Sequence, residues 1–563
     1  MKLNTFSYSL PKRLDDAVNL SLAEWQQHGL IARVWARDAT VWTGDDENKW
    51  LAWLDVVDEQ LAQAQKYRDL HGDIQSAGFT DVLLMGMGGS SLCPEVLAFT
   101  FGKANFHILD STVPTQVKTV ENKLVLTKTL FIVASKSGST LEPNCFKQYF
   151  YERVAEKVGR ENAGKQFIAI TDPGSKMEQV AKDGGFRHIF YGKPDIGGRF
   201  SALSAFGMAA AAAMGMDVEQ FLQNASEMVD ACRDDDTAEN PGAVLGLILG
   251  ACHAQGHDKL TIFTSPEIHD LGAWLEQLVA ESTGKKGVAI IPVDREPAQP
   301  AVSYGNDRIF AFLSLKGDMR FGEQQADLEA AGHPCVKVEL ESIDNLGQEF
   351  FRWEFATAVA GAVMKINPFN QPDVEAAKIE ARKITEEYEK TGKLPDETPF
   401  FKEAGFELFT RDEDAKTWRG EVASETAADY IRNFVHSDVG PGDYFGILAY
   451  VEMNAAHVKI LETFRKKVLE SRSVATCLGF GPRFLHSTGQ AYKGGGNNGV
   501  FLQITSDDEI DIAVPEQKFT FGVVKSAQAR GDFQVLIDRE RRALRVHITG
   551  DVGTGLEKLA GMI

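Results

Sequence analysis

Residues 135–140, with the sequence Ser-Lys-Ser-Gly-Ser-Thr, combine the groups that bind a phosphate. Hydroxyls and backbone N–H groups donate hydrogen bonds to phosphate oxygens, and the positive N-terminal end of a following helix attracts the anion. The segment follows an apolar run over residues 129–134 that indicates a buried parallel strand. Open α/β sheets bind ligands at the carboxyl ends of their strands. We therefore predict a phosphate site, the alternative being a serine-rich turn that only caps a helix.

Arg199 follows two glycines in the segment Gly-Gly-Arg-Phe-Ser of residues 197–201. A guanidinium group brought against a substrate oxygen can stabilise negative charge that develops there. The alternative is structural: the segment begins a helix, and Ser201 caps it.

Gln277 and Glu281 are four residues apart in a helical pattern that leads to Gly284, so they share one face of the helix. A carboxylate near a helix end, beside a glycine turn, can act as a general base. A solvated helix carboxylate is the commoner alternative.

The segment Gly-Met-Gly-Gly-Ser-Ser at residues 86–91 directly follows a strand candidate. Its glycines would let the backbone approach a ligand closely, but the third glycine of a dinucleotide-binding fingerprint is missing. A tight turn without a ligand is the alternative.

Pro372 stands where it would start a helix, which places Gln371 at the helix start. Lys378 then lies two turns along, on roughly the same side. The alternative for Lys378 is a solvated surface lysine.

Strand candidates alternate with helical patterns through two parts of the chain, which predicts an α/β fold with parallel sheets in two doubly wound subdomains. A helical stretch over residues 201–232 separates the two sets. The candidate strands of the first set are residues 82–87, 107–109, 130–134 and 167–171, and those of the second are 260–264, 288–293, 309–315 and 336–340.

At 563 residues the chain is too long for one hydrophobic core. We expect a mixed α+β region at the C-terminus, preceded by a charged helix over residues 379–390, with strand-like runs at 500–504, 519–524 and 544–548. The expected division is an N-terminal appendage (1–45), a first subdomain (46–235), a second subdomain (236–390) and the C-terminal region (391–563).

The composition argues against several partners. A net charge of −21 disfavours nucleic acid and anionic membranes, so an anionic substrate needs a local basic pocket. The six cysteines are scattered and form no Cys-x-x-Cys pair, and the N-terminus has no signal-peptide core. We therefore expect a cytoplasmic protein with reduced thiols and no metal or other cofactor.

The motifs named above occur in the order seen in phosphoglucose isomerase, so residues 45–380 resemble the glucose-6-phosphate isomerase family. More narrowly, the chain is similar to the isomerase half of bifunctional transaldolase/phosphoglucose isomerases, including residues 481–490, Gly-Pro-Arg-Phe-Leu-His-Ser-Thr-Gly-Gln. The resemblance implies two phosphosugar-isomerase (SIS-type) subdomains, a sugar-phosphate substrate, no cofactor and a homodimer. It does not imply transaldolase activity, because too few residues precede the first motif.

The resemblance also implies a reaction: reversible isomerisation of glucose 6-phosphate and fructose 6-phosphate through a cis-enediol. Glu281 would be the base, Arg199 would stabilise the enediolate, and Lys378 would assist ring opening. The residues implied to bind the substrate are Gly89, Ser90, Ser135, Lys136, Ser137, Thr140, Gln277 and Gln371.

The family usually carries a ring-opening histidine shortly after the base, but no histidine lies between His269 and His333. Our candidate is His486, because its loop is rich in glycine and hydroxyl groups. Arg308 is the second candidate, and a structural loop with an exposed histidine is the alternative. Other residues of this loop that could face the sugar are Arg483, Ser487, Thr488, Gln490 and Lys493.

Two other functions fit parts of the pattern. Another aldose–ketose isomerase, such as a phosphoglucose/phosphomannose isomerase, would use the same base. A non-catalytic sugar-phosphate sensor would need only the phosphate loop, and the presence of Glu281, Arg199, Gln371 and Lys378 argues against it.

Overall fold

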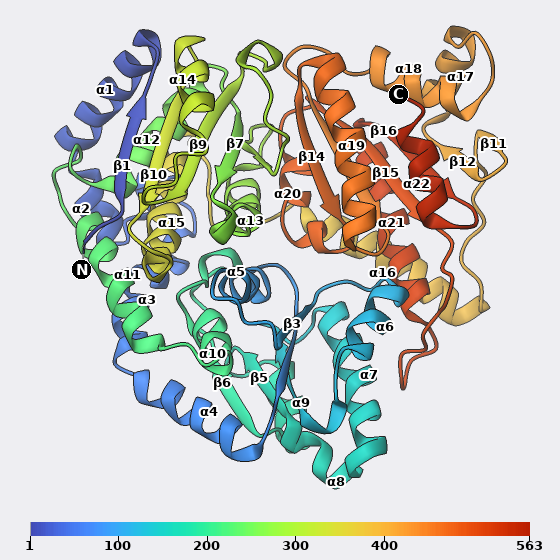
Figure 1. Cartoon of the computed structure of the whole chain (residues 1–563), viewed down its shortest axis with the longest axis horizontal. Coiled ribbons are helices and arrows are strands. Elements are labelled where there is room, and N and C mark those ends of the chain that lie inside the picture. Colours follow the sequence, from blue (N-terminus) through green and yellow to red (C-terminus); the bar gives the residue numbers. More distant parts are fainter. Residues whose placement is uncertain (1) are drawn as a thin grey trace.

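The first of three sheets carries the predicted phosphate loop. The computed structural model describes residues 2–563, and Figure 1 shows this sheet in the lower part of the molecule. Its strands are all parallel, in the order β3 (Phe106–Leu109), β2 (Asp81–Gly86), β4 (Thr129–Ala134), β5 (Phe167–Thr171) and β6 (His188–Tyr191). Four of them confirm the predicted set. The edge strand β6 was not predicted, because only Phe190 among its residues is buried and the apolar signal is weak.

The second sheet corrects the prediction for the N-terminus. Its order is β1 (Thr5–Ser9), β10 (Cys335–Leu340), β9 (Arg308–Leu315), β7 (Lys259–Thr264) and β8 (Ile291–Asp294). Strand β1 pairs antiparallel with β10 along its whole length, so residues 5–9 of the predicted N-terminal appendage (1–45) are part of the second sheet. The strand is short and half exposed, and its backbone hydrogen bonds to a strand more than 300 residues away leave no trace in local sequence.

The C-terminal region is more regular than the mixed α+β region that we expected. Its sheet runs β11 (Phe401–Glu403), β12 (Phe406–Phe409), β16 (Arg542–Ile548), β15 (Gly499–Ser506), β13 (Tyr444–Tyr450) and β14 (Ala475–Phe480). The last four strands are parallel, and an antiparallel hairpin closes one edge. The predicted strand at 519–524 is wrong. Thr520 accepts the N–H of Val523 and so caps helix α21, whose buried residues there give an apolar run. Thr520 forms an isolated bridge with Ala513, but residues 519–524 contain no strand.

Helices connect and cover these sheets (Figure 1). In the first two subdomains they are α1 (Lys12–Gln27), α2 (Leu30–Trp35), α3 (Val56–Leu61), α4 (Ala64–Ala77), α5 (Leu92–Thr100), α6 (Pro114–Asn122), α7 (Leu141–Val158), α8 (Arg160–Ala163), α9 (Lys176–Asp183), α10 (Ala205–Ala213), α11 (Val218–Cys232), α12 (Pro241–Ala254), α13 (Leu271–Thr283), α14 (Gly322–Ala330) and α15 (Leu346–Val363). Next along the chain are α16 (Val374–Thr391), α17 (Asp412–Glu421), α18 (Ala427–Ser437), α19 (Ala455–Arg472), α20 (Gly489–Gly494), α21 (Phe521–Asp538) and α22 (Val552–Ala560).

One apolar core joins the first two subdomains. Trp53 is fully buried, and its ring lies 5.3 Å from that of Phe200 and 5.7 Å from that of Phe351. The C-terminal sheet has an apolar core of its own, and the region contacts the rest of the fold through several elements, with α21 against α16, α20 against α13 and β14 against β8. No helix within residues 2–563 combines the length and the apolar character needed to cross a bilayer.

Candidate functional site

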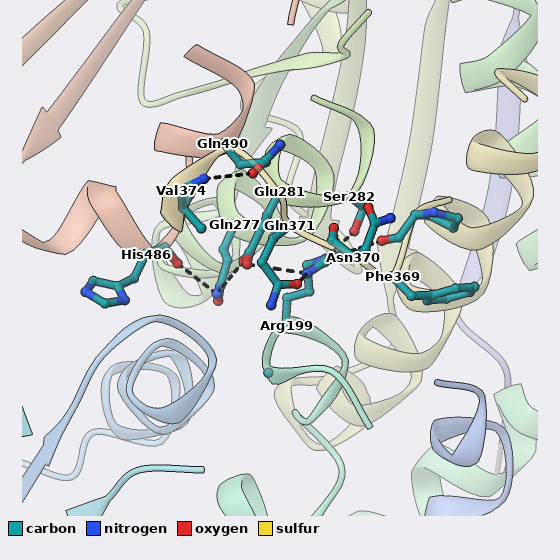
Figure 2. Close-up of polar contacts among 12 residues, drawn as sticks. Arg199, Gln277, Glu281, Ser282, Phe369, Asn370, Gln371, Val374, His486 and Gln490 are labelled. Carbon is teal, nitrogen blue, oxygen red and sulfur yellow. Dashed lines mark hydrogen bonds and ion pairs between the residues drawn. The ribbon is translucent and has the colours of Figure 1, made fainter. Parts of the chain in front are cut away.

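Four residues predicted from three separate motifs meet in one hydrogen-bonded cluster (Figure 2). Arg199 Nη1 lies 3.3 Å from Glu281 Oε1, and the same nitrogen donates to Gln371 Oε1 at 3.0 Å. Gln277 Nε2 donates to Glu281 Oε2 at 3.0 Å from one turn earlier on α13. A carboxylate and a guanidinium group that are adjacent, and held by two amides, can move a proton and stabilise the negative charge that results.

The Arg199 side chain is fixed on all sides. It is 1% exposed, and its Nε donates to Ser282 Oγ at 2.7 Å. Its Nη2 donates to the carbonyl oxygens of Pro368 at 2.5 Å and Asn370 at 3.0 Å. Burial lowers the pKa of Arg199, and the neighbouring Glu281 carboxylate partly offsets this by favouring the charged form. The guanidinium group is thus oriented before any substrate arrives.

The glycine-rich turn after β2 packs directly against this cluster. A Cβ on Gly89 would lie 1.9 Å from the carbonyl oxygen of Gly198, so only glycine allows the two loops to approach. Gly88 has a φ of +55°, and a Cβ there would lie 2.7 Å from the carbonyl oxygen of His486. Ser90 follows in the same turn and is half-buried. These glycines allow three distant segments to meet beside Arg199.

The predicted phosphate loop is open by comparison. Ser137 and Ser139 are exposed, and their hydroxyl oxygens lie 2.7 Å apart. Thr140 is half-buried at the start of α7. Ser135 Oγ is buried and has no hydrogen-bond partner among the described residues. The loop therefore keeps hydroxyl groups that no protein acceptor or donor outside it occupies.

Lys136 lies differently from the other residues of this loop. Its ammonium group pairs with Asp172 and donates to the carbonyl oxygens of Lys193 at 3.1 Å and Pro194 at 3.2 Å. Burial raises the pKa of Asp172, and the lysine opposes that shift. In this structure Lys136 fastens the loop to the segment that leads to Arg199.

His486 lies beside both halves of the site. It belongs to a short 3₁₀ helix (Arg483–His486) that follows β14, and its Nε2 is 2.8 Å from Oε1 of Glu142, in the first turn of α7. Its backbone carbonyl accepts a hydrogen bond from Gln277 Nε2 at 2.9 Å (Figure 2). Burial alone would raise the pKa of Glu142, but His486 and Lys378 favour the carboxylate and hold this pKa below its usual value.

The other two candidates for ring opening lie outside the cluster. Lys378 is on α16 with its Nζ 2.8 Å from Glu375 Oε1, and its side chain is 46% exposed. Arg308 is fully buried within β9, where it pairs with Glu296 at 2.9 Å and donates to Thr261 at 2.7 Å. Arg308 is therefore the wrong choice for the position of the missing histidine, because it cannot reach the cluster from inside the sheet.

Three of the residues that we expected to face a sugar are bonded to protein instead. Arg483 pairs with Glu95 and with Asp110 at 3.0 Å, and Lys493 is buried 2.5 Å from Asp532. Gln490 is fully buried between α13 and α16. The sequence shows the residue types but not these partners.

Sequence reasoning missed Glu142, Ser282 and Lys285. Lys285 is buried, and its Nζ donates to the carbonyl oxygens of Asn367 at 2.9 Å and Asn370 at 2.5 Å, which holds the segment before Gln371. Burial lowers the pKa of Lys285 well below its usual value. The signal was present, since these residues belong to or directly follow the motifs, but their partners are remote in sequence.

No group of three or more His, Cys, Asp or Glu side chains within residues 2–563 is arranged to hold a metal ion. The described site consists of one cation, one carboxylate, two amides and a histidine–carboxylate pair. Groups of these kinds can act as general acids and bases.

Comparison with known proteins gives consistent matches. The family model described as "Phosphoglucose isomerase" matches residues 53–306. The "Probable glucose-6-phosphate isomerase" of Methanococcus maripaludis is 27% identical over 368 residues, which cover 58% of this chain and 82% of that protein. The glucose-6-phosphate isomerase of Synechococcus sp. (strain JA-2-3B'a(2-13)) is 30% identical over 373 residues, which cover 56% of this chain and 68% of that protein.

One solved structure has the same fold over most of its length. A glucose-6-phosphate isomerase from Chlamydia trachomatis superposes with a TM-score of 0.57 at 19% sequence identity. The match covers 70% of this chain and 89% of that one. Part of this chain therefore extends beyond the shared fold.

Proposed function

Since this chain belongs to the phosphoglucose isomerase family, we propose that it interconverts glucose 6-phosphate and fructose 6-phosphate. The observation that carries the proposal is the contact of 3.3 Å between the buried Arg199 Nη1 and Glu281 Oε1. A C–H group beside a carbonyl is weakly acidic, so its removal needs a positioned base and a cation near the oxygen that becomes negative.

In the proposed reaction Glu281 removes the proton from C2 of open-chain glucose 6-phosphate. The electron pair of that C–H bond forms the C1=C2 double bond, and the carbonyl oxygen on C1 becomes an oxyanion beside Arg199. The proton of the C2 hydroxyl then passes to the C1 oxyanion, and as the C2 carbonyl forms, the electron pair of the double bond takes the proton back from Glu281 at C1. The products are a C2 carbonyl, which is fructose 6-phosphate, and a regenerated carboxylate.

His486 is the proposed acid for ring opening. It would give a proton to the ring oxygen as the bond from that oxygen to C1 breaks, the C1 hydroxyl would release its proton to a water molecule, and His486 would regain a proton from solvent. The Glu142 carboxylate at 2.8 Å would stabilise the imidazolium form. The lowered pKa of Glu142 supports this role, because it keeps the group charged. Lys378, which pairs with Glu375 and helps to keep Glu142 charged, would assist from outside the cluster.

Substrate binding divides between the two halves of the site. Ser135, Ser137 and Thr140 would hold the phosphate, with Lys136 keeping their loop in place through Asp172. The remaining residues proposed to contact the sugar are Gly89, Ser90, Gln277 and Gln371.

The six cysteines are free and buried, which supports a cytoplasmic location. The homodimer implied by the family stays a prediction.

The test is a coupled assay that follows glucose 6-phosphate formation from fructose 6-phosphate, carried out in H2O and in D2O. Wild-type turnover with deuterium at C2 of the product is expected, because the carboxyl proton of Glu281 exchanges with solvent. Glu281→Gln should lose at least about 10³-fold in kcat. Binding of the sugar phosphate without any wild-type turnover would instead indicate a sensor and overturn the proposal.

A further inference from the structure

We propose that Gln490 is a positioning residue of the isomerase: it sets the spacing between the helix that carries Glu281 and the helix start that carries Gln371. The inference rests on the proposed function. Gln490 belongs to α20 in the C-terminal region and is fully buried. It lies more than 10 residues in sequence from every group that it bonds, and it contacts none of the groups that we assign to catalysis (Figure 2).

One end of the Gln490 amide holds the start of α16. Its Oε1 accepts the backbone N–H of Asp373 at 2.9 Å and that of Val374 at 3.3 Å. The first N–H groups of a helix lack partners within the helix, and the side chain of Asp373 does not cap α16. Gln490 therefore supplies from another domain the cap that this helix lacks.

The other end of the amide holds the end of α13. Gln490 Nε2 donates to the carbonyl oxygen of Gly284 at 2.8 Å and to Asp373 Oδ2 at 2.6 Å. Gly284 lies three residues beyond Glu281. A Cβ on Gly284 would lie 2.2 Å from the Cα of Ala491, so α20 packs against the end of α13 without space to shift.

A single amide thus joins the two backbone segments whose side chains meet at Arg199. Arg539 strengthens the same junction, since its Nη1 lies 2.5 Å from Asp373 Oδ1 and donates to the carbonyl oxygen of Lys493 at 2.8 Å. If the junction loosens, Glu281 and Gln371 move relative to Arg199. The phosphate loop, which belongs to the first sheet, keeps its place.

The test compares Gln490→Leu with Gln348→Leu, a matched loss of a buried glutamine. Gln348 is also fully buried, and its Oε1 accepts the backbone N–H of Asn4 at 2.8 Å. Its side chain hydrogen bonds to Asn4 and Lys2 of the N-terminal segment, and not to the residues of the site. Misplacement of catalytic groups by about 1 Å costs on the order of 100-fold in rate. We expect Gln490→Leu to lower kcat by about 10- to 100-fold.

The phosphate loop keeps its place in Gln490→Leu, so the dissociation constant of a non-reacting sugar phosphate should change less than about 3-fold. A tenfold change would correspond to about 1.4 kcal/mol of lost binding. The kcat of Gln348→Leu should stay within about 3-fold of the wild-type value. Equal kcat losses in the two variants, or a loss of phosphate affinity in place of kcat, would overturn the inference.

Two further measurements separate positioning from simple loss of stability. Gln490→Glu keeps the acceptor for α16 but repels Asp373 and the Gly284 carbonyl until the introduced carboxyl is protonated. Burial raises the pKa of such a carboxyl, so protonation should occur in the range in which the enzyme is assayed. The kcat of Gln490→Glu, divided by that of wild type, should therefore rise as pH falls from 8 to 6. A ratio that does not change with pH contradicts the inference.

Hydrogen exchange gives a result that does not depend on activity. Gln490→Leu should speed exchange of the backbone N–H groups of Asp373 and Val374, whereas Gln348→Leu should not. The expected change in exchange does not depend on whether wild type turns over a sugar phosphate. The experiment therefore distinguishes a wrong proposed function from a wrong role for Gln490. Unchanged exchange at these two groups means that Gln490 does not hold the start of α16.

Discussion

The base side of the site and the phosphate loop differ in how far their polar groups are already occupied. Arg199 on the base side contacts Ser282, Gln371 and Glu281 as well as two backbone carbonyl oxygens. In the phosphate loop the hydroxyls of Ser137 and Ser139 are exposed and contact each other. The base side is organised in the absence of substrate, and in our proposal the phosphate loop makes its hydrogen bonds to the substrate with hydroxyls that are still exposed.

This difference assigns the two halves to different kinetic quantities. Fixed dipoles and charges that need no rearrangement stabilise a transition state most effectively. Groups that bond the unreacting phosphate contribute equally to the bound substrate and to the transition state, so they change KM. Variants on the two sides should therefore separate into kcat effects and KM effects.

The largest expected effect of this set is on the base side. Arg199→Lys keeps a positive charge but loses the planar array of donors that contacts Ser282, Gln371 and the backbone. We expect kcat to fall by about 10²- to 10³-fold, as for loss of one group that stabilises an oxyanion. KM should change little. Steady-state kinetics checks this, with a thermal melt to verify folding, and a pure KM effect would break the assignment of Arg199 to the transition state.

A smaller effect is expected in the phosphate loop. Ser137→Ala removes one hydroxyl from an exposed position, so the fold should keep its melting temperature. Loss of one hydrogen bond to a charged group costs about 1.5 kcal/mol or more, which raises KM by roughly 10-fold. The value of kcat should stay within a factor of two of wild type. An equal fall in kcat and kcat/KM would mean that the loop, too, acts in the transition state.

The smallest expected effect concerns the ion pairs that anchor the loop before His486. Arg483 pairs with Asp110, whose pKa burial raises to about 6 despite the opposing effect of the arginine. The folded protein then binds more protons than the unfolded chain between about pH 4 and pH 6, so the contribution of Asp110 to stability falls as pH rises through this range.

Urea unfolding of wild type and Asp110→Asn at pH 5.5 and pH 7.5 measures this contribution. Relative to the variant, wild type should lose about 1 kcal/mol of unfolding free energy between the two pH values. If the unfolding free energy of wild type minus that of Asp110→Asn is constant with pH, or grows with pH, then Asp110 is ionised throughout and anchors Arg483 as an ordinary ion pair.

The sequence predicted well those parts of the fold that local pattern determines. The eight strands expected in the two subdomains are present, because buried parallel strands are continuous apolar runs bounded by turn residues. Strands β1, β6, β11, β12, β13 and β14 were missed. β1 and β6 are short edge strands with few buried residues, and their hydrogen bonds come from remote strands.

The candidate site shows the same contrast between residues that local pattern predicts and contacts that depend on remote partners. Arg199, Gln277, Glu281 and Gln371 each lie in a recognisable motif, and the structure brings them together. Glu142 and the bonding roles of Gln490 and Lys136 could not be predicted, because each depends on a partner from another domain or strand. No local pattern records that His486 reaches across to α7.

Whether the C-terminal region supplies the ring-opening acid is tested most directly with His486→Gln, which keeps a donor for the Glu142 carboxylate. Two substrates are compared: cyclic glucose 6-phosphate, and erythrose 4-phosphate, an aldose that cannot close a ring because its terminal oxygen carries the phosphate. We predict a loss of about 10²-fold in kcat/KM on the cyclic sugar. Turnover of the open-chain sugar should be unchanged within the error of the assay. Equal losses on both substrates, or no loss on either, would contradict a role for His486 in ring opening.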